Sequence, residues 1–190
     1  MTEELWTWAR CSSQILSLKR RLGFGDTIEF LRYLITDTGI IRDTMTSSHV
    51  DDAELVYWIL TTYAESAQVP LNDTLVPYNN LPGGYAFFGA FKKLAIDPLL
   101  PVFGSNTDGF RRCCLHFEGV IQPYGDVSFT IHALPLLPIT VVFWERSEEF
   151  PARCSILYDT SASQYLATEA LAHLGELLSS RLIQASEMIE

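Results

Sequence analysis

The fold class is decided by the stretch Val127-Ser128-Phe129-Thr130-Ile131-His132-Ala133, in which apolar and polar residues alternate as in a half-buried strand. Two further runs, Ile139 to Glu145 and Arg153 to Tyr158, are rich in β-branched and aromatic residues. Because the connections between the three runs are short, antiparallel neighbours are favoured over parallel strands joined by helices. We therefore predict a three-stranded antiparallel meander over residues 127–158.

Helical periodicity flanks this meander on both sides. Residues 51–64 predict a helix opened by a capping box, in which Asp51 accepts from a first-turn amide and Glu54 reaches back. Shorter helices are expected over residues 85–94 and 108–117. After the meander, Thr168 is expected to cap a long helix. The apolar stripe of that helix consists of Leu171, Leu174, Leu178 and Leu182.

The N-terminal part predicts a helix followed by a β-hairpin. Residues 3–21 show helical spacing of their apolar positions and are followed by two glycines. Residues 26–35 and 39–45 alternate as strands do, and Thr36-Asp37-Thr38-Gly39 suits the turn between them.

The order of helix, hairpin, central helices, meander and C-terminal helix predicts an α+β fold. Length favours a single domain over residues 1–190, with residues 1–22 as a candidate interaction arm. Residues 68–82 are rich in proline and asparagine and are expected to form a long loop. Most of the aromatic residues that follow are expected to lie in the core, with a partner helix or an apolar cofactor as the alternative for part of their surface. They are Tyr85, Phe87, Phe88, Phe91, Phe103 and Phe110.

The charge balance and the hydropathy exclude several classes of partner. The chain has 13 basic and 23 acidic residues, a formal net charge of -10, so a nucleic-acid backbone is not expected as a ligand. The longest apolar run, residues 133–144, is interrupted by prolines and is shorter than the roughly 20 residues of a membrane span. Because the first residues also lack the pattern of a signal peptide, a soluble, cytoplasmic protein is expected.

One edge of the predicted meander gathers charged side chains. The antiparallel order brings Asp126, Glu145 and Arg153 to the same edge, where the connection between the second and third strands also lies. Carboxylates held close together raise one another's pKa, which is one way to make a general acid. The alternative is a solvated acidic loop with arginine counter-ions. The candidate ligand- or partner-binding residues at this edge are Asp126, Trp144, Glu145, Glu148 and Glu149.

Two further segments are candidate binding sites. Asp159 ends the third strand and is followed by hydroxyl side chains, a pattern that binds ligands but more often organises a turn. Gly83, Gly84 and Tyr85 precede a predicted helix, where backbone amides can bind an anion. A tight turn at the start of the helix explains the same glycines.

The cysteines give only a weak metal signal. Cys113 and His116 share a helical face and Cys154 is a remote third ligand, whereas a tetrahedral zinc ion needs four. Buried free thiols are the favoured interpretation, so we predict no metal site and leave the cofactor open. The scattered histidines and serines form no recognisable nucleophilic triad.

A series of landmarks adds a family resemblance. These landmarks are Leu81-Pro82-Gly83-Gly84-Tyr85, Trp144, Glu148-Glu149-Phe150-Pro151-Ala152 and Ile156-Leu157-Tyr158-Asp159. Over about residues 50–175, and in the hairpin, the chain resembles an uncharacterised domain-of-unknown-function family of anaerobic bacteria and archaea. Some members carry an N-terminal iron–sulfur segment, for which this sequence has no cysteine-rich counterpart. The resemblance implies a setting in anaerobic redox or one-carbon metabolism and no particular reaction.

Three functions are compatible with these observations. The first is a non-catalytic accessory module that binds a protein partner or a bulky small-molecule ligand. The second is an acid–base enzyme that uses the carboxylates at the sheet edge. The third is a structural subunit of a homo-oligomer, assembled through Trp6 and the leucine stripe of the last helix.

Overall fold

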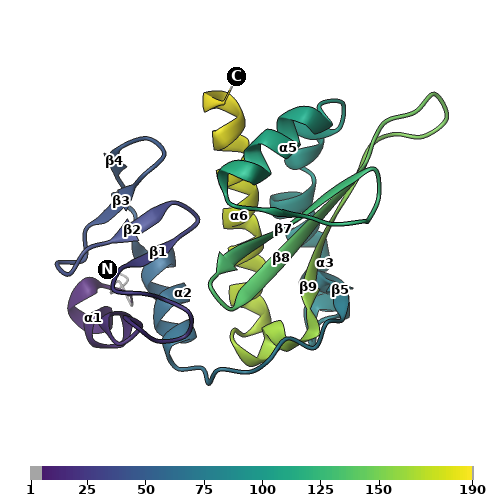
Figure 1. Ribbon diagram of the computed structural model, residues 1–190. Coiled ribbons are helices and arrows are strands. Elements are labelled where there is room, and N and C mark those ends of the chain that lie inside the picture. Colours follow the sequence, from purple (N-terminus) through teal and green to yellow (C-terminus); the bar gives the residue numbers. More distant parts are fainter. Residues whose placement is uncertain (1–5, 190) are drawn as a thin grey trace.

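The computed structural model describes residues 6–189 and confirms an α+β fold with two antiparallel sheets. Figure 1 shows the N-terminal sheet beside the first two helices, and the main sheet beside the remaining helices. Within the described range, no helix is both long and apolar enough to cross a membrane.

The predicted meander is confirmed and forms the centre of the main sheet. Its strands are β7 (Val127–Leu134), β8 (Leu137–Trp144) and β9 (Arg153–Asp159). Val141 pairs with Phe129 on one side and with Ile156 on the other, so these side chains share one face. That face is the apolar half of the alternation seen in the sequence.

Two edge strands complete the main sheet in the order β5-β9-β8-β7-β6 within the described residues. The first is β5 (Leu75–Pro77), which pairs with β9, and the second is β6 (Val120–Ile121), which pairs with β7. The prediction of a long loop over residues 68–82 is therefore wrong for residues 75–80, which form β5 and the short 3₁₀ helix Tyr78–Asn80. Pro77 suits this position, because an edge strand leaves one row of amides without a ladder partner.

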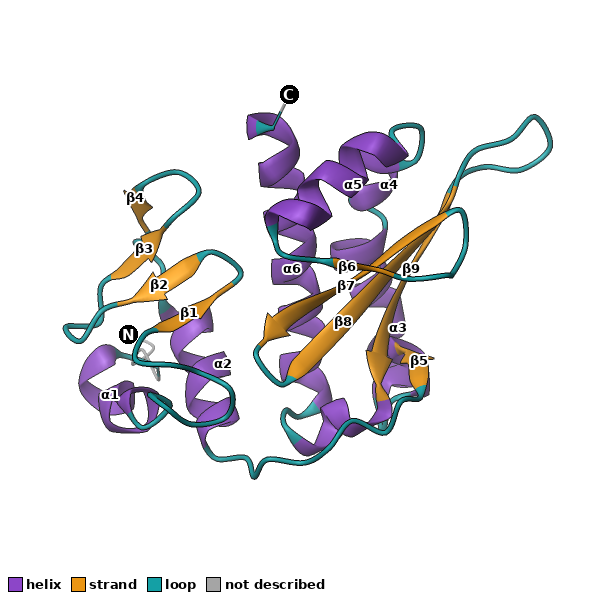
Figure 2. Cartoon of the chain, in the orientation of Figure 1, coloured by secondary structure: helices purple, strands orange, loops and turns teal. Residues whose placement is uncertain are grey.

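The main helices cover one face of this sheet, as Figure 2 shows. They are α3 (Gly84–Phe91), α4 (Leu99–Phe103), α5 (Thr107–His116) and α6 (Thr168–Met188). A π-helical segment, Lys92–Ile96, follows α3. The ring of Phe110 lies 4.7 Å from that of Phe143 and 6.0 Å from that of Phe129, both at edge-to-face angles. Aromatic packing therefore joins α5 to the centre of the sheet.

The predicted C-terminal helix is confirmed, but its cap differs. Ala167 occupies the N-cap position, and the hydroxyl of Thr168 instead donates to the carbonyl of Pro82. All four leucines of the stripe are buried within the chain. They pack in the core of this molecule, so the stripe is not an exposed surface for oligomer contacts.

The predicted hairpin is instead a four-stranded sheet within the described residues. Its strands are β1 (Ile28–Phe30), β2 (Tyr33–Ile35), β3 (Ile41–Asp43) and β4 (Ser48–His49). The turn between β2 and β3 is confirmed: the Gly39 amide donates to Thr36, and Gly39 has φ 87°, which favours glycine. The expected first strand is broken because Leu31 and Arg32 adopt left-handed φ angles of 46° and 65°.

The first two helices pack under this sheet. Helix α1 (Trp8–Leu16) ends earlier than predicted, and the predicted residues 3–5 lie outside the described range. The ring of Trp8 lies 5.8 Å from that of Tyr57, which joins α1 to α2 (Glu54–Ala64). Helix α2 is confirmed, but its capping box is wrong: Ala53 is the N-cap residue and no side chain caps this end.

Candidate functional site

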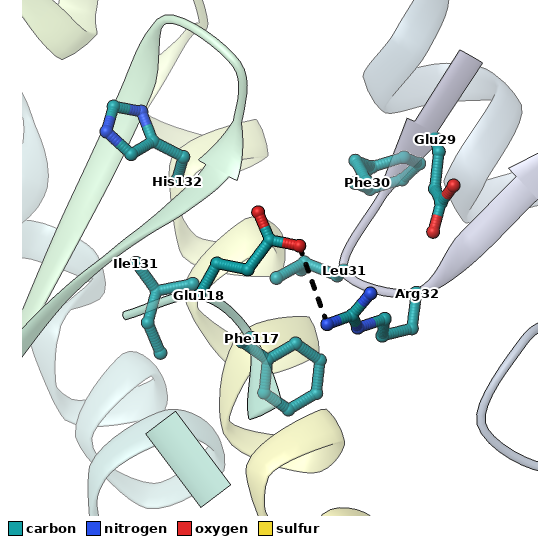
Figure 3. Close-up of a pocket in the computed structure, with 8 residues that line it drawn as sticks. All are labelled: Glu29, Phe30, Leu31, Arg32, Phe117, Glu118, Ile131 and His132. Carbon is teal, nitrogen blue, oxygen red and sulfur yellow. Dashed lines mark ion pairs between the residues drawn. The ribbon is translucent and has the colours of Figure 1, made fainter. Parts of the chain in front are cut away.

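A cleft of about 440 Å³ lies between the N-terminal sheet and the main sheet, and Figure 3 shows the side chains that line it. One wall is the end of β1 and the turn into β2, and the other is the chain after α5 together with β7. Four buried apolar side chains line it: Phe30, Leu31, Phe117 and Ile131. The polar lining residues are Glu29, Arg32, Glu118 and His132. The lining is therefore half apolar and half polar or charged, and its polar groups could orient a small molecule.

Arg32 connects the two walls. Its Nη2 donates to the carbonyl of His116 and lies 3.7 Å from Oε1 of Glu118. The Arg32 side chain is 29% exposed, whereas that of Glu118 is 86% exposed. The guanidinium is therefore held in place by backbone, while the carboxylate is solvated and contributes little free energy to the pair.

Three lining residues have left-handed backbone conformations. They are Leu31, Arg32 and Glu118, whose φ angles are 46°, 65° and 58°. For residues other than glycine, each such conformation costs on the order of 1 kcal/mol and persists only where the surroundings impose it. The turn at Glu118 closes the end of α5 through local bonds, from the Glu118 amide to Leu115 and from the Gly119 amide to Cys114. The turn at Leu31 instead depends on tertiary contacts.

A buried arginine behind the cleft supplies one of these contacts. Nε of Arg181, on α6, donates to the carbonyl of Leu31 at 3.0 Å. Its guanidinium pairs with both oxygens of Asp43 at 2.7 and 2.8 Å, and its centre lies 4.2 Å from the ring centroid of Tyr33. Burial by itself would raise the pKa of Asp43, but the bonds from Arg181 and from the Met45 amide outweigh it and lower the pKa to about 2. The Asp43 carboxylate therefore stays ionised at neutral pH.

The two histidines near the cleft differ in their surroundings. Burial, and then the positive charges of Arg32 and Arg181, lower the pKa of His116, so its ring is neutral at neutral pH. Nδ1 of His132 lies 2.9 Å from the carbonyl of Pro135. Because a carbonyl only accepts, Nδ1 donates this bond, and Nε2 is the ring nitrogen left for other contacts.

The charged side chains predicted at one edge of the meander do lie there, but they contact mainly neighbouring side chains and nearby backbone. Asp126 accepts from the Glu145 amide at 2.7 Å, and the Glu145 carboxylate accepts from the hydroxyl of Thr107. Trp144 lies beneath the guanidinium of Arg153 at 5.3 Å. Glu148 and Glu149 are exposed on the long connection between β8 and β9, which extends away from the sheet in Figure 1. The hollow at this place is lined by residues 146–151 of that connection itself.

Asp159 organises a turn, the interpretation that the sequence favoured. Its carboxylate accepts from the amides of Asn72, Thr74 and Ser161 at 2.9 to 3.1 Å, and it is buried. Although burial opposes it, the bond from Ser161 and those from Asn72 and Thr74 lower the pKa of Asp159. These bonds hold the approach to β5 against the end of β9, which is a structural role.

Gly83 and Gly84 form a tightly packed turn at the N-terminus of α3. Gly83 has φ 77°, and the Gly84 amide donates to the carbonyl of Leu81 at 2.9 Å. A Cβ on Gly84 would lie 2.0 Å from the carbonyl oxygen of Tyr78, so any other residue at this position would force the backbone to shift. Tyr85 is largely exposed to solvent on the first turn of α3.

The cysteines lie in or near the core. Cys113 and Cys114 are buried, whereas His116 is exposed, so the proposed i, i+3 pair spans two different environments. Burial raises the pKa of Cys113, Cys114 and Cys154, which keeps these thiols protonated. Among residues 6–189, no three His, Cys, Asp or Glu side chains gather closely enough to hold a metal ion.

Sequence reasoning missed the cleft and its residues Arg32, Glu118 and Arg181. The first two are separated by 86 positions and carry no local motif. Arg181 did carry a signal, because it follows Leu178 by three residues on the buried stripe of α6. A charge at such a position requires a buried partner.

Comparison with known proteins identifies one family. A family model described as a domain of unknown function (DUF3786) matches residues 27–181. The match begins after α1 and includes both sheets, so it confirms the resemblance over the hairpin and residues 50–175. No curated protein and no solved structure matches the chain.

Proposed function

The chain belongs to the DUF3786 family, whose function is unknown, and we propose that it is a non-catalytic module that binds a small anionic molecule in the cleft between its two sheets. The observation that carries this proposal is the position of Arg32 in a half-apolar cleft. We also propose the setting that the resemblance implies, a cytoplasmic protein of anaerobic redox or one-carbon metabolism.

The chemistry of Arg32 indicates the ligand's charged group. Within residues 6–189, both contacts of its guanidinium come from Nη2, and the hydrogen bond to His116 uses one of the two N–H groups of that atom, so Nε, Nη1 and the second N–H of Nη2 remain to donate. A guanidinium presents paired donors that match a carboxylate or a phosphate. Oε1 of Glu118 lies 3.7 Å from Nη2 of Arg32, and the Glu118 side chain is 86% exposed, so this carboxylate is held weakly. A carboxylate or phosphate of the ligand displaces it.

The remaining lining residues indicate the rest of the ligand. The cavity of about 440 Å³ is within the size range of small-molecule sites. Phe30, Phe117 and Ile131 offer apolar surface beside the guanidinium. The expected ligand therefore combines one anionic group with a compact apolar body, and His132 lines the cleft where a polar group on that body would lie.

The experiment is a thermal-shift screen of small carboxylates and phosphate esters with aliphatic or aromatic bodies, followed by calorimetric titration of the compounds that raise the melting temperature. We expect Arg32→Met and Arg32→Lys to weaken binding by about tenfold or more, because the paired donors are lost. Glu118→Gln should strengthen binding, since it removes the competing carboxylate.

Arg20→Met is the matched control, because Arg20 also has a left-handed φ of 58° and pairs with a carboxylate, Asp26, at the surface. It should leave affinity unchanged. The proposal is overturned if no compound of the screen binds, or if the Arg32 variants bind as tightly as the unaltered protein.

A further inference from the structure

A second surface, remote in sequence from the cleft, runs along α6 and α3. It has two adjoining hollows of about 170 and 260 Å³, and Leu94 and Glu176 line both of them. On the α6 side this groove extends from Glu169 to Ile183, about 21 Å at the helical rise per residue. A groove of that length accommodates about four turns of another helix.

The floor and one wall of this groove are apolar. Phe91 is buried at its base, where its ring stacks on that of Tyr78 with centroids 4.2 Å apart. Phe87 and Leu94 are 56% and 49% exposed, although the sequence suggested that the aromatic residues here are mostly core. Large apolar side chains exposed beside a groove are typical of surfaces that bind another molecule.

The other wall is acidic. Glu169 and Glu176 line the groove on α6, and His173 lies between them with Nδ1 3.5 Å from Oε2 of Glu176. None of the residues that line the two hollows is a lysine or an arginine. Nearby, Lys92 pairs with Asp97 at 2.5 Å, and Lys93 is exposed outside the lining.

We propose that this groove binds an amphipathic helix of another protein whose apolar stripe is flanked by lysine or arginine residues. Apolar side chains at i, i+3, i+4 and i+7 would lie over Phe87, Phe91 and Leu94, as in known helix-in-groove complexes. Basic residues beside that stripe would face Glu169 and Glu176. A second copy of this chain fits less well, because its net charge of -10 opposes self-association.

The test uses a synthetic peptide of leucine, alanine and lysine, about 16 residues long to match the groove. Two controls accompany it: a scrambled peptide without an apolar stripe, and a peptide with glutamate in place of lysine. Fluorescence anisotropy should show binding of the basic amphipathic peptide alone, weakened by added salt. Equal binding of all three peptides, or of none, overturns the proposal.

Variants then locate the contact. Phe87→Ser, and separately Glu169→Gln with Glu176→Gln, should each weaken binding by about tenfold. Phe150→Ser is the matched control, because Phe150 is 65% exposed on the β8–β9 connection. Binding that survives Phe87→Ser would contradict the proposal, as would a dimer in sedimentation equilibrium that Phe87→Ser abolishes. Arg32→Met should leave peptide binding intact, so failure at the cleft and failure at the groove are separable.

Discussion

Arg181 and Asp43 form a bidentate ion pair between α6 and β3, 138 residues apart in sequence. The same guanidinium donates to the carbonyl of Leu31, whose next neighbour Arg32 lines the cleft. The pair therefore joins the N-terminal sheet to the last helix and also positions one wall of the candidate site. We therefore expect changes at this pair to alter both stability and any binding at the candidate site.

Breaking this pair from one side should be strongly destabilising. Asp43→Asn leaves a buried guanidinium without its counter-charge, which should lower the free energy of unfolding by about 3–5 kcal/mol. Urea unfolding followed by circular dichroism measures this loss. The double variant Asp43→Leu, Arg181→Met removes both charges and should recover most of it. A double variant less stable than Asp43→Asn would contradict the argument.

Lowering the pH should reduce the free energy of unfolding through protonation of Asp43. Its pKa in the folded state, about 2, lies below the unfolded value of about 3.9, so the unfolded chain binds more protons between these values. The contribution, about 2 kcal/mol, is complete above roughly pH 5 and is lost as the pH falls toward 2. Urea unfolding at a series of pH values measures it. In Asp43→Asn the unfolding free energy should depend less on pH, with a residual dependence that comes from Asp159. A pH dependence equal to that of the unaltered protein would contradict the role given to Asp43.

The aromatic contact between α5 and the sheet should dominate local stability. Phe110 is fully buried against Phe143, so Phe110→Ala should cost about 3–5 kcal/mol of unfolding free energy. Phe150→Ala, the same substitution at an exposed position, should change it by less than about 0.5 kcal/mol. Equilibrium unfolding of both variants tests the packing, and similar losses at the two sites would show that it is misassigned.

Two glycines of α3 should respond in opposite directions to alanine. The methyl group of Gly84→Ala would collide with the backbone carbonyl of Tyr78, so we expect a loss of about 1–3 kcal/mol. Gly89 lies in the same helix, and a Cβ there would meet nothing within 4 Å. Gly89→Ala should therefore stabilise the protein by about 0.5–1 kcal/mol through helix propensity. Melting temperatures that move the same way would refute this difference.

The sequence predicted the centre of the fold because that part obeys a regular period. Strands β7, β8 and β9 alternate or run apolar over seven or eight residues, and the stripe of α6 repeats over several turns. The edge strands β5 and β6 contain three and two residues, too few for any period to appear. Their pairing follows from the neighbouring strand and not from their own residues.

The errors in the N-terminal sheet have a different cause. The alternation of residues 26–35 is real, but the left-handed backbone of Leu31 and Arg32 divides it into β1 and β2. Neither residue prefers that conformation, so local propensity could not have indicated it. The donation from Arg181 to Leu31 helps to impose it, and that contact spans 150 positions. The cleft escaped prediction for the same reason, since its two walls meet only in the folded chain.

The distance between Asp43 and Arg181 along the chain also sets an order of events during synthesis. At about 5–20 residues per second, a ribosome adds Arg181 roughly 7–28 seconds after Asp43. Once β4 has been made, the N-terminal sheet therefore has its carboxylate for most of that interval but lacks the guanidinium that pairs with it. The first-made sheet of this protein thus reaches its final packing only when the last-made helix arrives.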